Sequence, residues 1–195
     1  MARPREFDAQ AVLDACLDQF WAKGFAAVSL SDLEAATGLG RQSLYSAFGD
    51  KRALFAAVLE RYAQATEQWL APLFSPEAGL MQLAQYARDA LAAQRAHGAH
   101  GCLVVKTLWD RDLDDSALTR RAAAAAKRVR AAFAQALEQS ARRGELSAGD
   151  SAQRADLCFA TLNGLAALRR AGVSEAQALA LFEGLIDTWR PRTGR

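Results

Sequence analysis

The sequence predicts an all-α protein, and three observations support this fold class. Apolar residues recur at intervals of three and four over most of the 195-residue chain, and runs of β-branched residues at strand spacing are absent. No proline lies between Pro76 and Pro191, which leaves a long span free for helices. The glycines fall mostly at junctions between helical patterns. The pattern indicates about nine helices in two unequal groups.

The first helix is expected from near Asp8 to about Lys23, where Gly24 ends it. Its apolar residues come in pairs that recur every four positions. They are Val12, Leu13, Cys16, Leu17, Phe20 and Trp21. This spacing gives one broad apolar stripe facing a core.

Two short helices follow and meet at a glycine turn. The first runs from Leu30 to about Thr37 and opens on a capping box, Ser29 with Asp32. Gly38 ends it, because glycine reaches a positive φ at little cost. The second, from about Gly40 to Phe48, buries Leu44 and Phe48 and leaves polar side chains on its other side. This arrangement is typical of a helix-turn-helix, whose second helix enters the DNA major groove.

A long helix capped by Asp50 should run until Pro72 and link the two parts of the chain. The predicted domains are a DNA-binding domain at 1–50 and a ligand-binding and dimerisation domain at 51–195, with 51–71 as the linking helix. The second domain should hold further helices. They are expected at 80–96, 115–141, 150–172 and 174–189, with a short apolar helix or turn at 102–110.

Composition narrows the class of protein. The net charge is only +2, so any DNA contact must come from a local basic patch. The charged start of the chain has no apolar run after it, and no stretch approaches the roughly 20 apolar residues of a membrane helix. Three widely spaced cysteines suit a reducing compartment better than a disulfide framework or a zinc site. We therefore expect a cytoplasmic protein without a metal, a cofactor or a membrane partner.

The N-terminal region resembles the signature of the TetR/AcrR family of transcriptional regulators over roughly Phe7 to Leu59. Many positions agree in order without a gap. The matching residues are Gly24, Phe25, Ser29, Leu33, Gly38, Leu39, Ser43, Leu44, Tyr45, Phe48 and Lys51. One position departs, because Gly40 stands where the family usually has a capping serine. Glycine is a tolerable cap.

The resemblance implies the residues that contact DNA. Arg41 and Gln42 suit guanine and adenine edges in the major groove. Tyr45 and Lys51 match the phosphate-binding positions of the family, with Lys51 at a helix start that also favours an anion. Three hydroxyls are further candidates: Ser29, Ser43 and Ser46. Capping alone is an equally open explanation for Ser29, and Arg3 with Arg5 are candidates for an arm along the DNA.

The resemblance also implies a small-molecule pocket in the second domain. The candidate lining residues are Tyr62, Trp69, Tyr86, Cys102, Lys106, Trp109 and Phe133. Core packing explains most of these large side chains equally well. The segment from Gly101 resembles a Gly-Cys-aliphatic segment of one family branch, which usually has asparagine at the position of Lys106. This lysine either selects an anionic ligand or pairs with Asp110 four residues on.

Two other uses of this segment are kept as alternatives. Cys102, near His100 and Lys106, is a candidate sensor of oxidants or electrophiles, against the simpler role of a small buried side chain. His97 and His100, with the acidic residues downstream, are a weak candidate for a metal site. An enzyme built on His97, His100 or Cys102 is the alternative from another class, although the sequence offers no complete catalytic set.

The last two long helices carry more apolar surface than one helix pair needs, and the resemblance implies that they form a dimer interface. The predicted interface residues are Leu162, Leu165, Ala166, Leu181, Phe182, Leu185 and Trp189. An ordinary intrachain hairpin is the alternative. The sequence therefore predicts a homodimeric regulator, most simply a repressor, that binds a palindromic operator in double-stranded DNA and is released by a small-molecule effector.

Overall fold

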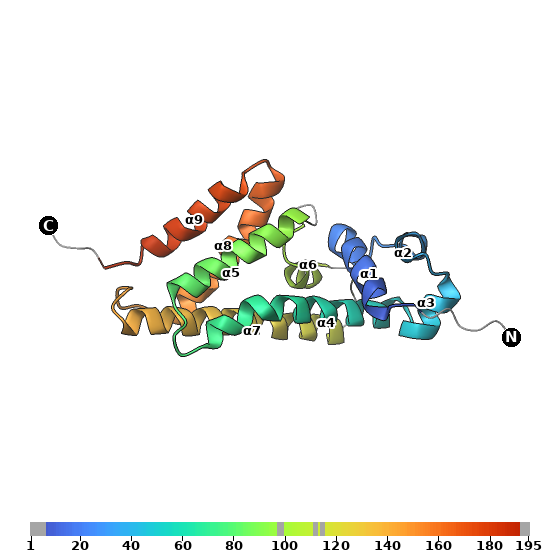
Figure 1. The fold of residues 1–195 in the computed structure, drawn as a ribbon, viewed down its shortest axis with the longest axis horizontal. Helices are drawn as coiled ribbons and strands as arrows, with labels where there is room; N and C mark the ends of the chain where they lie inside the picture. Colours follow the sequence, from blue (N-terminus) through green and yellow to red (C-terminus); the bar gives the residue numbers. More distant parts are fainter. Residues whose placement is uncertain (1–6, 97–99, 111–112, 114–115, 192–195) are drawn as a thin grey trace.

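A computed structural model describes residues 7–96, 100–110, 113 and 116–191 of the chain. Within these ranges the molecule has nine α-helices, one 3-10 helix and no strand, which confirms the all-α prediction. It is elongated, with the N-terminal helices at one end and the last helix at the other (Figure 1). Over the same ranges, no helix combines the length and the apolar character that crossing a membrane requires.

Three short helices form the head of the molecule: α1 (Ala9–Lys23), α2 (Leu30–Thr37) and α3 (Arg41–Phe48). Asp8 caps α1 by accepting hydrogen bonds from two backbone N–H groups, as expected. Gly38 ends α2 in the left-handed region, with φ at 67°, which confirms the predicted turn. The apolar pairs of α1 are buried with Leu33 and Leu44, so the spacing of the sequence predicted this core correctly.

Helix α4 (Lys51–Leu70) starts at Asp50, whose carboxylate accepts the Ala53 N–H, and continues into a 3-10 turn at Ala71–Phe74. Its first half packs into the head, where the Phe55 ring lies 4.8 Å from that of Phe20. Its last residue, Leu70, lies in the core of the larger part of the chain. The helix therefore joins both cores, and the domain boundary at residue 50 stays a prediction.

The larger part, which we call the body, contains α5 (Leu80–Ala96), α6 (Leu103–Trp109), α7 (Ser116–Arg142), α8 (Ser151–Arg170) and α9 (Glu175–Asp187). Helix α7 runs beside α4 along the length of the molecule (Figure 1). The body core centres on Phe133 and Phe182, both fully buried.

The helix ends of the body lie within two residues of those expected from the sequence. Asp150 caps α8, and Ser174 with Gln177 forms the predicted capping box of α9. Helix α9 ends at Asp187, two residues before the expected Trp189. There the backbone tightens, because the N–H groups of Thr188 and Trp189 bond to carbonyls only three residues back.

Candidate DNA-binding and ligand-binding sites

Helix α3 presents a polar face to solvent. Leu44 is fully buried and holds the helix against the head, whereas Arg41, Gln42 and Ser46 are exposed. These three residues and Tyr45 surround a shallow depression, and the Arg41 guanidinium lies 5.5 Å from the centre of the Tyr45 ring. The structure therefore brings four of the predicted DNA-contacting residues to one exposed surface, while their contact with DNA stays a prediction.

The start of α3 is capped from another helix. Gly40 has no side chain to offer, and the Glu34 carboxylate on α2 accepts the Arg41 N–H at 2.6 Å instead. No local signal in the sequence predicts this contact, because the two residues are seven apart and belong to different helices. Glu34 thereby fixes the first turn of α3, on which Arg41 and Gln42 stand.

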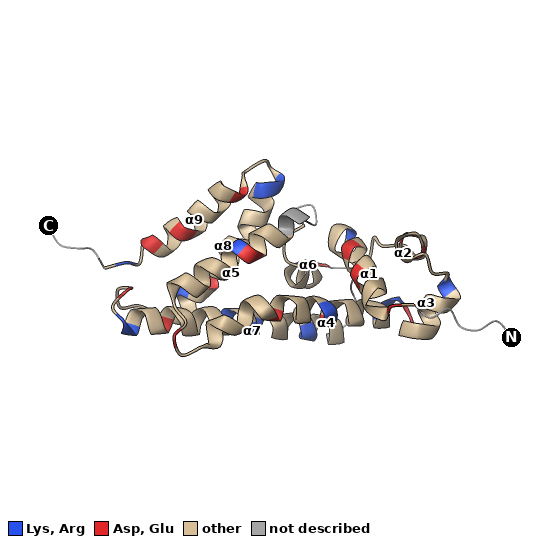
Figure 2. Ribbon diagram, in the orientation of Figure 1, with Lys and Arg blue, Asp and Glu red and all other residues tan. Residues whose placement is uncertain are grey.

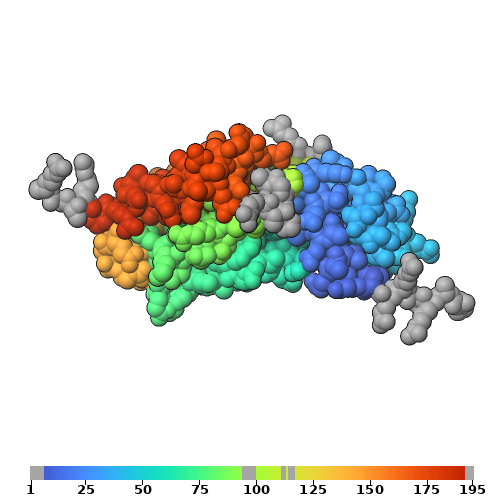
Figure 3. Space-filling model, turned by 45° about the horizontal axis from the view of Figure 1, so that its top comes forward, coloured from blue at the N-terminus to red at the C-terminus, as the bar shows by residue number. Residues whose placement is uncertain are grey.

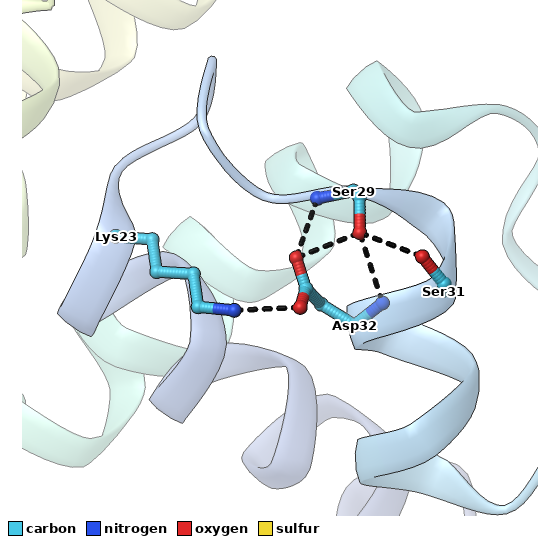
Figure 4. A network of polar contacts seen from close by, with 4 residues as sticks. All are labelled: Lys23, Ser29, Ser31 and Asp32. Carbon is cyan, nitrogen blue, oxygen red and sulfur yellow. Dashed lines mark hydrogen bonds and ion pairs between the residues drawn. The ribbon is translucent and has the colours of Figure 1, made fainter.

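A polar network holds the start of α2 to the end of α1 (Figure 4). The Ser29 hydroxyl accepts the Asp32 N–H at 3.1 Å and donates to the Asp32 carboxylate at 2.7 Å. Lys23 Nζ donates to the other carboxylate oxygen at 2.6 Å. The hydrogen bonds from Lys23 and Ser29 hold the pKa of Asp32 well below its usual range. The capping role of Ser29 is confirmed, and its phosphate contact remains untested.

Lys51, the predicted phosphate-binding lysine, lies in the first turn of α4 beside the loop between α1 and α2. Its ammonium is 4.7 Å from the centre of the Phe25 ring and 3.5 Å from the Ala26 carbonyl oxygen. Burial lowers the pKa of Lys51, and the carboxylates of Asp110 and Asp32 oppose that shift. The lysine is thus partly desolvated and held in place before any anion arrives.

The acidic residues of the head are engaged in contacts within the chain. Asp14 accepts from Arg61 at 3.0 Å, Asp32 pairs with Lys23, and Glu34 caps α3. Helix α3 itself contains one arginine and no acidic residue. Figure 2 shows basic ribbon at the start of α3, with acidic positions of this end on α1, on α2 and in the loops beside α3. This placement leaves α3 the least acidic helix of the head.

A cavity of about 70 Å³ lies in the body beneath α4 and against α1. Its walls include five residues that the sequence analysis proposed for ligand binding. They are Tyr62, Trp69, Tyr86, Cys102 and Phe133. The structure brings these side chains together from α4, α5, α7 and the start of α6, and ligand binding there stays a prediction.

Two of the proposed ligand residues line an adjoining cavity instead, and their contact with a ligand stays a prediction. Lys106 and Trp109 line a separate, more open cavity of about 220 Å³ with His100. Trp109 is 76% exposed, because α6 turns this side away from the body. Gly101, Cys102 and Asn163 line both cavities, and the Cys102 Sγ accepts the Tyr62 hydroxyl at 3.6 Å.

Four polar or aromatic residues of the cavity walls were not predicted from the sequence: Trp21, Thr66, Phe159 and Asn163. Trp21 reaches the cavity from α1 and donates its indole N–H to the Gly101 carbonyl at 2.6 Å. Thr66 and Asn163 also line it. The Asn163 side-chain N–H₂ donates to the Phe159 carbonyl at 2.8 Å, which orients the amide. Trp21 lies in the apolar stripe of α1, and nothing in the sequence indicates that its side chain reaches a cavity in the body.

Helix α6 holds the corner between α1 and α2 from both sides. Lys106 Nζ donates to the carbonyls of Trp21 and Ala22, each at 2.8 Å, at the C-terminal end of α1. Asp110 accepts the N–H groups of Phe25 and Ala26 at 3.1 and 3.4 Å. The Lys106 ammonium is therefore bound to the backbone of α1, while its contact with a ligand stays a prediction. We call Lys106 and Asp110 together the α6 clamp.

Four of the predicted dimer residues are buried inside the chain. Leu162, Leu165, Ala166 and Phe182 pack within the body of the single chain, and their part in a dimer interface stays a prediction. Helix periodicity alone does not say which stripe of an apolar helix faces its own core. Leu181 is 52% exposed, and Leu185 and Trp189 are partly exposed.

The metal alternative gains no support from the described part of the chain. There, no three His, Cys, Asp or Glu side chains gather closely enough to hold an ion. His97, Arg3, Arg5 and most of the acidic run after residue 110 lie outside the described residues.

Sequence comparisons agree with this architecture. The family pattern "Bacterial regulatory proteins, tetR family" matches residues 12–58. The HTH-type transcriptional repressor ComR of Escherichia coli (strain K12) is 48% identical over 60 residues, 31% of this chain and only 29% of ComR. The uncharacterized HTH-type transcriptional regulator YezE of Bacillus subtilis (strain 168) is 30% identical over 156 residues, 77% of this chain and 79% of YezE. The chain belongs to the TetR family of bacterial regulatory proteins.

A solved structure of a TetR family regulator has the same fold along its whole length. A cysteine mutant of the TetR family transcriptional regulator CifR, in complex with 26-bp operator DNA, matches 96% of this chain and 100% of CifR. The TM-score is 0.82 and the sequence identity is 27%. As a TetR family member, the chain is a transcriptional regulator and not an enzyme.

Proposed function

We propose that this TetR family protein is a homodimeric repressor that binds a palindromic operator through α3. The observation that carries the proposal is the exposed polar face of α3, with Arg41 and Gln42 in its first turn and Leu44 buried behind them. CifR, a structural relative over its whole length, is bound to operator DNA. In this proposal Arg41 and Gln42 contact base edges, and Ser43, Tyr45, Ser46 and Lys51 contact phosphates or flanking bases. Operator binding places the protein in the cytoplasm, where the DNA is.

A second copy of the chain would pack on the outer face of α8 and α9. These helices cover a broad part of the surface in Figure 3. Leu157, Leu168 and Leu181 are each between 44% and 52% exposed on them. Gly164 and Gly184 lie within α8 and α9, and a Cβ at either position would meet nothing within 4 Å. Such glycines cost helix stability unless another helix approaches closely, and a partner's α8 and α9 would do so.

A dimer also suits the proposed target. Two α3 helices must enter successive major-groove faces about 34 Å apart, or a multiple of that spacing. The separation of the two heads then decides operator affinity. A ligand that favours a different separation would shift the population of dimers away from the DNA-binding state.

The α6 clamp supplies the proposed connection between the ligand cavity and the head. Gly101 and Cys102, which precede α6, line the cavity, and Lys106 and Asp110 hold the corner between α1 and α2. The Ala26 N–H donates to Asp110, and the Ala26 carbonyl accepts from Lys51. A ligand that moves the start of α6 would therefore move α1 and the environment of Lys51. Helix α4, which packs into both cores, would transmit the same movement from the body to the head.

Fluorescence anisotropy on the DNA flanking the gene, over a series of salt concentrations, tests the DNA-binding part. Tight and sequence-dependent binding should have a steep salt dependence, and Lys51→Ala should reduce the slope by roughly one ion. The double change Tyr45→Ala with Lys51→Ala should abolish binding. Lys127→Ala, an exposed lysine on α7, is the matched control. Weak binding without any preference for a DNA sequence, both in this assay and in a selection from random DNA sequences, would contradict the proposal.

A response to oxidants or electrophiles through Cys102 is the second candidate. It is favoured by one observation: the Cys102 sulfur lines both cavities of the body, whereas Cys16 and Cys158 are fully buried. Burial raises the pKa of the Cys16 thiol to about 11 and that of Cys158 to about 12, so neither is a reactive thiolate. Operator release by an alkylating agent from the parent protein, but not from Cys102→Ser, would support this function. Equal release from both would exclude it.

A further inference from the structure

The walls of the 70 Å³ cavity carry no charged side chain, and every residue that lines it lies in the described part of the chain. Aromatic rings dominate, with Trp69, Tyr86 and Phe133 from three different helices. The free volume is roughly five times the ~10–15 Å³ that a single water molecule requires. The space therefore suits a compact molecule rather than an extended one.

Two cations on helices that line the cavity, Lys106 and Arg128, are bound to other groups of the chain. Lys106 donates to the α1 carbonyls on the far side of α6. Arg128 follows Lys127 on α7, pairs with Glu67 and lies 4.9 Å from the centre of the Phe74 ring. Both positive charges thus have partners in the chain, and neither is available to a carboxylate in the cavity.

The polar groups that do face the cavity are neutral. Burial raises the pKa of the Tyr86 hydroxyl and of the Tyr62 hydroxyl, so both phenols stay protonated. The Tyr62 hydroxyl donates to Cys102, and the Thr66 hydroxyl donates to the backbone of its own helix. The Asn163 side chain donates through its nitrogen to Phe159, which leaves its carbonyl oxygen as an acceptor.

We propose that the cavity takes a compact, uncharged molecule with one ring and one hydroxyl-type hydrogen-bonding group, and that it rejects carboxylates and ammonium ions. The ring would lie among Trp69, Tyr86 and Phe133, and the hydroxyl would donate to the Asn163 carbonyl oxygen. Burying an unpaired ion in such walls is far more costly than burying a neutral polar group that finds a partner. This inference rests on the proposed ligand response and names the chemical class of the ligand.

Three probes of nearly the same shape test the charge preference: benzyl alcohol, benzoate and benzylammonium. Their binding to the full-length protein is measured at pH 7 by titration calorimetry and by the rise in Tm. We expect saturable binding of benzyl alcohol and at least tenfold weaker binding of both ions. Equal or tighter binding of either ion, or no binding of benzyl alcohol, would overturn the proposal.

Two variants locate the binding. Val129→Phe fills the cavity and should weaken the binding of benzyl alcohol at least tenfold. Met81→Phe, at a 75% exposed position on α5, should leave that affinity unchanged. Asn163→Leu should weaken the binding of benzyl alcohol about tenfold. It should change the affinity for benzene, which has no hydroxyl, by less than threefold. If Val129→Phe fails to fold, Asn163→Leu still decides, and benzyl alcohol binding that neither variant changes would overturn the proposal.

Operator anisotropy on the same samples separates this inference from the proposed function. Operator release by benzoate but not by benzyl alcohol would overturn the ligand class and leave the ligand response intact. Benzyl alcohol bound at the cavity of a protein that recognises no operator would overturn the proposed function and leave the ligand class intact.

Discussion

Replacing Lys106 by methionine should loosen the head from the body. Methionine keeps an unbranched apolar stem of similar length, so the packing beside Gly24 is largely preserved while the ammonium is lost. The carbonyls of Trp21 and Ala22 then lose their charged donor at the C-terminal end of α1. The change therefore tests whether the α6 clamp stabilises the fold and positions the head.

The expected loss follows from the geometry. Two hydrogen bonds of 2.8 Å from a cation are each worth roughly 1.5–3 kcal/mol in favourable cases. Burial lowers the pKa of Lys106, first through desolvation and then through the charge of Arg170, so part of this gain is already offset. We expect a net loss of about 2 kcal/mol in the free energy of unfolding, or a fall in Tm of roughly 4–8 °C for a chain of this size.

Urea and thermal unfolding, followed by circular dichroism at one fixed protein concentration, measure the loss. Lys127→Met is the matched control, because Lys127 is exposed on α7 and should change stability by less than ~0.5 kcal/mol. Operator affinity should also fall in Lys106→Met, since the orientation of the head becomes less fixed. If Lys106→Met is as stable as Lys127→Met and binds the operator as tightly as the parent, the clamp has no such role and the coupling path through α6 is wrong.

Three further changes have definite expected outcomes. Trp21→Phe keeps a ring but leaves the buried Gly101 carbonyl without its 2.6 Å donor, so urea unfolding should show a loss of about 1–3 kcal/mol; an unchanged midpoint would contradict this. The pKa of Asp32 is lower in the folded state than its unfolded value of about 3.9, so its contribution to stability is complete above that value and is lost as the pH falls through the folded pKa. The free energy of unfolding of Asp32→Asn should therefore fall less steeply at acid pH than that of the parent. Equal slopes for the two proteins in a pH series would refute this. Leu181→Glu should produce monomers in sedimentation and weaken operator binding, whereas Met81→Glu should not; dimers of unchanged stability would exclude the outer face of α8 and α9 as the interface.

Local signals in the sequence predicted most of the secondary structure. Ser29 with Asp32, Ser174 with Gln177 and the turn at Gly38 could be assigned directly, because these caps join residues within four positions of each other. The polar face of α3 followed from the spacing of Leu44 and Phe48. These features are fixed by short-range hydrogen bonds and by helical periodicity, which a single sequence displays.

The tertiary structure alone decided which side chains meet. The sequence predicted Leu162 and Phe182 at a dimer interface, but the packing of α8 and α9 against α5 and α7 buries both side chains. The same packing leaves Leu157, Leu168 and Leu181 exposed. The sequence predicted Lys106 as a ligand contact. Because α6 packs near the end of α1, the Lys106 ammonium donates hydrogen bonds to two backbone carbonyls there.

The sequence by itself thus determined the helices, the helix-turn-helix and the family. The folded chain decided that Glu34 caps α3, that Trp21 reaches the cavity, and that the cavity walls carry no charge. The physical reason is that helix formation depends on neighbours in the sequence. The partner of a polar or apolar side chain depends instead on which faces of distant helices pack together, and helical periodicity does not specify that choice.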